Sequence, residues 1–77
     1  MIRFHGSHRA FIEKHYDLDI VTSDDDSYYK ALTYIEANEH EYERLLLHGD
    51  KCECITPRHV REYIKDKVEA IAKIYNL

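Results

Sequence analysis

Five aspartates stand within the stretch DLDIVTSDDD, residues 17–26. Closely spaced carboxylates can hold a divalent cation, cap the N-terminus of a helix or form a charged surface for a partner. A calcium-binding loop is excluded, because a loop starting at Asp25 has Lys30 where the pattern D-x-[DN]-x-[DN]-G-x5-E requires glycine. Helix capping is the simplest role for Asp24, Asp25 and Asp26, since acidic side chains in a first turn complement the positive end of the helix dipole.

A second possible site combines two histidines with the two cysteines. His48, Cys52, Cys54 and His59 follow the pattern H-x3-C-x-C-x4-H, and zinc accepts both thiolate and imidazole ligands. The spacing matches none of the familiar zinc motifs, and free cysteines are also common as small buried apolar residues. We therefore predict no cofactor, while zinc at these four residues stays open.

A third possible site pairs a Gly-Ser turn with alternating aspartates. FHGS, ending in Gly6 and Ser7, is followed by DLDI, which contains Asp17 and Asp19. This combination resembles the signature of the polymerase-β-like nucleotidyltransferases, especially their minimal members. The resemblance implies a Gly-Ser loop that holds a nucleoside triphosphate, Mg²⁺ bound by the two aspartates, and a third carboxylate from a later strand, for which Glu53 is the candidate. A minimal or degenerate nucleotidyltransferase-like domain is therefore the alternative function.

Negative charge is concentrated in one segment of the chain. Residues 17–43 contain nine acidic side chains and one basic one, Lys30, which gives −8 within a chain whose net charge is −4. A field of one sign attracts partners of the opposite sign and repels nucleic acid, so we predict no direct nucleic-acid binding.

We favour a small acidic, non-catalytic protein-interaction module over an enzyme. Its expected partner is a basic protein that itself binds DNA or RNA, so that the module acts as a nucleic-acid mimic or inhibitor of the kind typical of phages and mobile elements. The residues expected to contact the partner are acidic, apart from one tyrosine: Asp24, Asp25, Asp26, Tyr29, Glu36, Glu39, Glu41 and Glu43.

The elements that must position these residues follow from periodicity and from the turn residues. Apolar residues at helical spacing between 28 and 46 predict a long helix over about 25–48, and a second long helix is predicted from Pro57 to about Tyr75. A short helix is expected near residues 7–16, with strands near 2–5, 18–22 and 51–55. The predicted fold is α+β, with two long helices, one short helix and a small two- or three-stranded sheet.

Length and composition restrict the remaining possibilities. The 77 residues predict a single domain, 1–77, with a thin stability margin. Small domains often gain stability from a second subunit, so we predict a homodimer. No apolar run reaches the roughly 18 residues of a membrane helix. Two cysteines, separated by one residue, are poorly placed for a disulfide, which favours a reduced, cytoplasmic protein.

Overall fold

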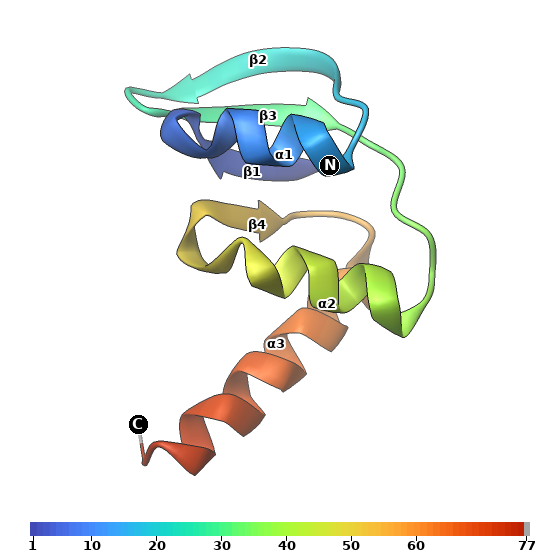
Figure 1. The fold of residues 1–77 in the computed structure, drawn as a ribbon, viewed down its shortest axis with the longest axis vertical. Coiled ribbons are helices and arrows are strands. Elements are labelled where there is room, and N and C mark those ends of the chain that lie inside the picture. Colours follow the sequence, from blue (N-terminus) through green and yellow to red (C-terminus); the bar gives the residue numbers. More distant parts are fainter. Residues whose placement is uncertain (77) are drawn as a thin grey trace.

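The computed structural model describes residues 1–76, which form an α+β fold (Figure 1). The predicted fold class is confirmed, but the sheet has one strand more than predicted and the first of the two predicted long helices is much shorter. The strands are β1 (Ile2–His5), β2 (Asp19–Asp25), β3 (Tyr28–Leu32) and β4 (Cys52–Cys54). The helices are α1 (Arg9–His15), α2 (Glu39–Leu47) and α3 (Arg58–Ile74), and single 3-10 turns precede α1 (η1, Gly6–His8) and β4 (η2, Gly49–Lys51).

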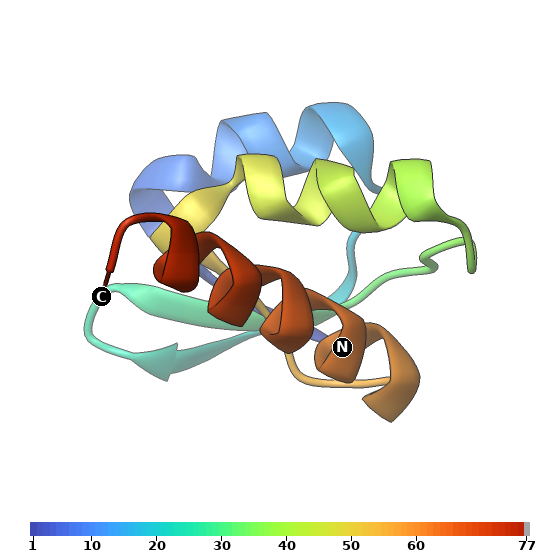
Figure 2. The same cartoon turned by 90° about the horizontal axis from the view of Figure 1, so that it is seen from below.

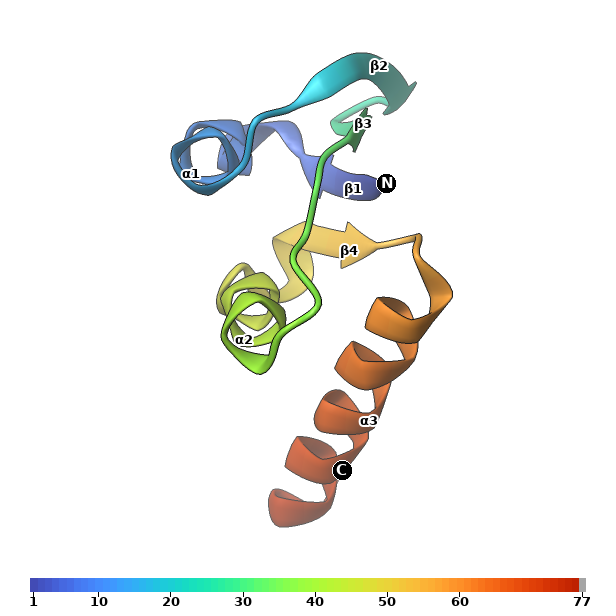
Figure 3. The same cartoon turned by 90° about the vertical axis from the view of Figure 1, so that its right-hand side faces the viewer.

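The four strands form one sheet in the order β2-β3-β1-β4, with antiparallel neighbours throughout. This order, with the element sequence β1-α1-β2-β3-α2-β4, is the split β-α-β arrangement of ferredoxin-like domains, to which this chain adds α3. Figure 2 shows α1 and α2 together on one face of the sheet. In Figure 3, α3 runs away from the sheet beyond the β4 edge. No helix within residues 1–76 is both long and apolar enough to cross a bilayer.

Residues 19–32 form a β-hairpin. The strand predicted near 18–22 is confirmed as β2, but β3 occupies residues where the sequence predicted the first part of a long helix. Thr22 pairs with Lys30 and Ser23 with Tyr29, and the chain turns between β2 and β3. The side chains of β3 alternate, so that Tyr29 and Ala31 share a face with buried residues of β1. The helix predicted over 25–48 is therefore wrong in its first part, because strand pairing with β1 and β2 stabilises an extended chain there, and only residues 39–47 are helical.

The helix that forms in this region, α2, is capped by the asparagine that precedes it. The Asn38 side chain accepts a hydrogen bond from the backbone N–H of Glu41 at 2.9 Å, which caps the first turn. The helix ends before Gly49, whose φ of 58° lies in the left-handed region that glycine adopts without a steric penalty. The predicted stop at Gly49 is confirmed, while the predicted start at Ser23 or Asp24 is wrong.

β4 and α3 form close to the predicted positions. β4 occupies Cys52–Cys54 and pairs with β1, and α3 starts directly after Pro57. Val60, in the first turns of α3, is completely buried. Beyond it, Val68 and Ile71 are 52% and 46% exposed. The N-terminal part of α3 is therefore anchored to the core, and its C-terminal part is not.

The core lies between the sheet and the helices. Ile2 and Phe4 of β1, Ile12 of α1 and Val60 of α3 are fully buried, and each such side chain stabilises the fold by about 1.5–3 kcal/mol. Four further buried residues complete the core: Tyr16, Ala31, Leu45 and Cys54. This small core fixes the relative positions of β1, α1 and the start of α3.

Candidate functional site

The three hairpin aspartates do not cap a helix. Asp24 lies on β2 and accepts a hydrogen bond from Arg3 Nε at 2.6 Å, and Lys30 Nζ lies 3.3 Å from its other carboxylate oxygen. The hydrogen bond from Arg3, together with Lys30, lowers the pKa of Asp24. Asp25 accepts a hydrogen bond from the backbone N–H of Asp26 at 2.8 Å, which fixes the hairpin turn. Asp24 is therefore paired within the fold, while Asp25 and Asp26 remain exposed at the turn.

Tyr29 packs inside the fold. Its ring stacks on Phe4 with centroids 5.9 Å apart, and it lies so close to Gly6 that a Cβ added there would come within 3.0 Å of the ring. A side chain at position 6 would therefore be tight against this ring, and Tyr29 presents less surface to a partner than the sequence suggested.

The four predicted glutamates lie at the other end of β3, in or before α2. Glu39 accepts a hydrogen bond from Tyr63 O–H at 2.7 Å, which raises the pKa of Tyr63 to about 12. Glu41 lies 3.4 Å from Arg44. Glu36 and Glu43 are exposed. Because the hairpin turn and α2 lie at opposite ends of β3, the eight predicted contact residues do not form one continuous helix face (Figure 1).

Tyr34, one of several tyrosines whose type suits an interface, lies in the connection between β3 and α2. It was not among the residues expected to contact the partner. This side chain is 81% exposed, beside Glu36 in the sequence. Asp19 pairs with Leu32, so the start of β2 approaches the same connection. We call Asp19, Tyr34, Glu36, Glu39 and Glu43 the acidic end. The exposure of Tyr34 follows from the end of β3 at Leu32, a strand boundary that the sequence did not predict.

The nucleotidyltransferase-like residues occupy three parts of the sheet. Gly6 and Ser7 form a 3-10 turn directly after β1, where the Ser7 backbone N–H donates to His5 Nδ1 at 3.1 Å. Asp17 and Asp19 lie at the entry to β2, and Glu53 is on β4, where Arg61 binds it at 2.6 Å. β2 and β4 are opposite edges of the sheet, so Glu53 does not converge with the aspartates.

The proposed zinc ligands also occupy different environments. His48 is buried at the end of α2, Cys52 and Cys54 lie on β4, and His59 is exposed on α3. Burial raises the pKa of Cys52 to about 12 and raises that of Cys54 as well, which disfavours the thiolate form that binds metals. Within residues 1–76, no three His, Cys, Asp or Glu side chains are arranged to hold a metal ion.

A cluster of histidines forms between α1 and α2. His8 Nε2 and His48 Nδ1 are 2.8 Å apart, and the ring of His15 lies 5.5 Å from that of His48. His48 is only 5% exposed, and its Nε2 has no hydrogen-bond partner within residues 1–76. The pKa of His48 is lowered. The main cause is burial of the ring, and the charges of His8, His15 and Arg44 contribute less. We call His8, His15 and His48 the histidine cluster; their wide separation in the sequence concealed it.

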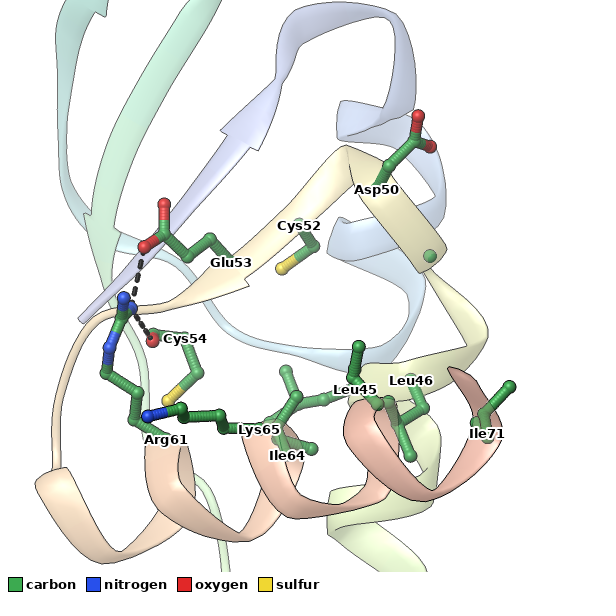
Figure 4. A pocket seen from close by; sticks show the side chains of 12 residues that line it. Leu45, Leu46, Asp50, Cys52, Glu53, Cys54, Arg61, Ile64, Lys65 and Ile71 are labelled. Atoms are coloured by element: carbon green, nitrogen blue, oxygen red, sulfur yellow. Dashed lines mark hydrogen bonds and ion pairs between the residues drawn. The ribbon is translucent and has the colours of Figure 1, made fainter. Parts of the chain in front are cut away.

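An open groove of about 570 Å³ lies beside the free edge of β4 (Figure 4). Leu45 and Leu46 of α2 line one side, and Ile64, Val68 and Ile71 of α3 line the other. Figure 4 shows Arg61 and Lys65 toward one end of the groove, and Asp50 and Ile71 toward the other. Arg61 is engaged by Glu53 and by the Cys54 carbonyl oxygen at 2.9 Å. The groove is thus apolar at its base and charged at its rim.

Comparison of the chain with protein-family models, with curated proteins and with solved structures finds no match. The assignment of function therefore depends on the residues and the geometry alone.

Proposed function

We propose that this protein is a non-catalytic protein-interaction module whose acidic end binds a basic surface on another protein. The observation that carries the proposal is the 81% exposure of Tyr34, two residues before the exposed Glu36 in the connection that leads to α2. Tyrosine is enriched at protein interfaces because it offers a large contact area and a polar tip, and such anchors are typical of binding hot spots.

The charge arrangement around Tyr34 supports this role. Glu39 and Glu43 are separated by one turn of α2, an arrangement of like charges that costs a helix about 0.2–0.5 kcal/mol. Lys67 Nζ is 4.0 Å from Glu39, a distance at the limit of an ion pair, and Lys67 is 43% exposed. Glu39 also accepts the hydrogen bond from Tyr63, but within residues 1–76 no basic side chain is in ion-pair range of Asp19, Glu36 or Glu43. A basic partner therefore gains attraction without first breaking a strong ion pair.

The proposed partner is a nucleic-acid-binding protein, because such proteins carry clustered Lys and Arg side chains. The acidic end is short, since α2 has only nine residues. It therefore suits one basic patch rather than a long phosphate-binding channel. Asp25 and Asp26, at the far end of the hairpin, form a second and separate acidic point.

The test is affinity capture with the wild-type chain and two matched variants. One variant removes the acidic end's aromatic anchor and two charges, Tyr34→Ser with Glu36→Gln and Glu43→Gln. The control variant removes two exposed carboxylates of α3, Glu62→Gln and Glu69→Gln. The captured protein is then purified, and its direct binding is measured at low and moderate salt, with and without competing duplex DNA.

We expect a basic protein that binds wild type and the control variant equally, loses at least tenfold in affinity with the acidic-end variant, and is displaced by the duplex. Equal binding by all three chains would contradict the proposal. A partner that the duplex does not displace would contradict the nucleic-acid-binding identity of that partner.

A nucleotidyltransferase-like function is the second candidate, and the observation in its favour is the tight Gly6-Ser7 turn directly after β1. The test is NMR titration with Mg²⁺ and nucleoside triphosphates. Shifts at Ser7, Asp17 and Asp19, abolished by Asp17→Asn with Asp19→Asn, would support it. Unmoved signals at these residues would remove it.

A further inference from the structure

We propose that the groove between α2 and α3 is the interface of a two-fold symmetric dimer, in which the α3 helices of two copies pack antiparallel. This surface is separate from the acidic end, so the proposal stands or falls independently of the proposed function.

The first observation is that α3 lacks a packing partner over much of its length. The helix has 17 residues, and its N-terminal half contacts the core through the buried Val60 and the partly buried Ile64. The apolar residues farther along are exposed, with Ile74 at 75% and Tyr75 at 70%. Figures 1 and 3 show this half of α3 projecting beyond the sheet and α2. An isolated helical stretch of this length is marginal in water without tertiary packing.

The second observation is that the groove and the exposed stripe belong to the same surface. Ile64, Val68 and Ile71 recur at helical spacing and line the groove, opposite Leu45 and Leu46 of α2. A second α3 of the same kind can fill the groove while its own groove receives the first helix. In an antiparallel pair centred near Val68, Ile64 of one copy faces Ile71 of the other. Such self-complementarity is what a two-fold interface requires.

The third observation is the charge at the groove's rim. Lys65 and Asp50 are exposed, and neither forms an ion pair within residues 1–76. Lys65 lies toward the Arg61 end of the groove and Asp50 toward the Ile71 end (Figure 4). When the second α3 runs antiparallel to the first, Lys65 of the second copy lies at the end of the groove where Asp50 of the first copy is. The two-fold axis places Lys65 of the first copy near Asp50 of the second in the same way. The rim is thus complementary to a second copy in the antiparallel orientation, whereas a parallel orientation would place Lys65 beside the second copy's Lys65.

The fourth observation is the thin core of the single chain. The core contains eight buried apolar residues, both cysteines are free, and no metal-binding group is present within residues 1–76. Domains of this size commonly need a further source of stability. Burying the α3 stripe against a second copy supplies apolar burial that the single chain lacks.

The test is sedimentation equilibrium of the full chain at tens of micromolar and above, with four single variants and one mixture. Val68→Asp places a charge at the centre of the interface. Lys65→Asp and Asp50→Lys each replace two attractive rim contacts per dimer with two repulsive ones. Lys73→Asp is the matched control for Lys65→Asp, because Lys73 is on α3 but does not line the groove. Circular dichroism and thermal unfolding check that every variant folds.

We expect wild type and Lys73→Asp to sediment as a species of twice 9.2 kDa. Val68→Asp raises the dimer Kd by about a hundredfold or more, because a charge is buried without a partner. Lys65→Asp and Asp50→Lys each raise it by about tenfold. An equimolar mixture of these two variants restores association, since the mixed dimer has opposite charges at both rim contacts.

Three outcomes would overturn the proposal. A monomeric wild type at several hundred micromolar would show that a second copy does not occupy the groove, leaving it to another protein or a small apolar ligand. A dimer that survives Val68→Asp would place the interface elsewhere. A dimer that is lost with Val68→Asp, but whose charge variants do not complement each other, would exclude the antiparallel arrangement.

Discussion

The buried His48 makes the stability of this fold dependent on pH. Its pKa is lowered in the folded protein by burial and by His8, His15 and Arg44, whereas in the unfolded chain it returns to 6.5. The unfolded chain therefore binds a proton more readily. The stabilising contribution is fully present above pH 6.5 and is lost as the pH falls below that value toward the folded pKa.

The size of the effect has an upper bound. A difference of one bound proton changes the free energy of unfolding by about 1.4 kcal/mol per pH unit. Between pH 6.5 and pH 5 the loss is therefore at most about 2 kcal/mol. For a domain of this size, about 1 kcal/mol corresponds to a decrease in Tm of about 4–8 °C.

The assay is urea unfolding followed by circular dichroism at several pH values between 8 and 5, at a few micromolar protein. His48→Phe keeps a ring of similar size that cannot titrate, and His48→Gln serves if the phenylalanine does not fit. His40→Gln, on the exposed side of α2, is the control. The titration of Asp24 does not interfere, because its lowered pKa places its contribution below pH 3.8.

We expect wild type and His40→Gln to lose stability between pH 7.5 and pH 5, with a contribution from His48 of at most about 2 kcal/mol, and the His48 variants to lose clearly less. An equal loss in the His48 variants would assign the pH dependence to other groups. Unchanged wild-type stability over this range would refute the reasoning from burial.

Three further predictions concern packing, backbone conformation and thiol reactivity. Ile12→Val removes one methylene from a fully buried side chain and should lower the free energy of unfolding by about 0.5–1.5 kcal/mol in urea titration, while an unchanged midpoint would show that the core relaxes into the space. Gly49→Ala has room for its methyl group, but φ of 58° should cost about 1–2 kcal/mol, and a stabilised variant would contradict the left-handed conformation. Cys52, with its pKa raised to about 12, should react with iodoacetamide far more slowly in the native chain than in urea at pH 8, and equal rates would show that the thiol is not buried.

The parts of the fold that were predictable are those specified by local signals. Thr56-Pro57 marks the start of α3, Gly49 the end of α2, and the alternation of Ile2 and Phe4 marks β1. These signals depend on turn chemistry and on short periodicity, which the local sequence determines.

The β2–β3 hairpin was not predictable in this way, because its stability comes from pairing with β1. Tyr28 and Leu32 are four residues apart, so they fit a helix as well as one face of a strand. The turn between β2 and β3 contains Asp26 and Ser27 but no glycine, which weakened its signal. Only the partner strand distinguishes the two interpretations.

The candidate site was less predictable than the fold. The sequence shows directly that acidic side chains are concentrated in residues 17–43. Their arrangement as one surface was predicted from a helix over 25–48, of which only residues 39–47 are helical. Arg3 lies far from Asp24 in the chain, and only the sheet brings them together at 2.6 Å. Likewise, the groove needs α3 to project beside β4, which no periodicity specifies.

The central position of β1 has a consequence for the order of folding. Ile2 pairs with Ala31 on one side and with Cys54 on the other, so both neighbours of β1 are synthesised later than β1 itself. The β2–β3 hairpin is the one sheet pairing within residues 1–76 that forms between consecutive strands. A pairing between strands far apart in the chain loses loop-closure entropy before its contacts can stabilise it. A growing chain can therefore form the hairpin early, but β1 keeps an open edge, able to associate with other strands, until Cys54 leaves the ribosome.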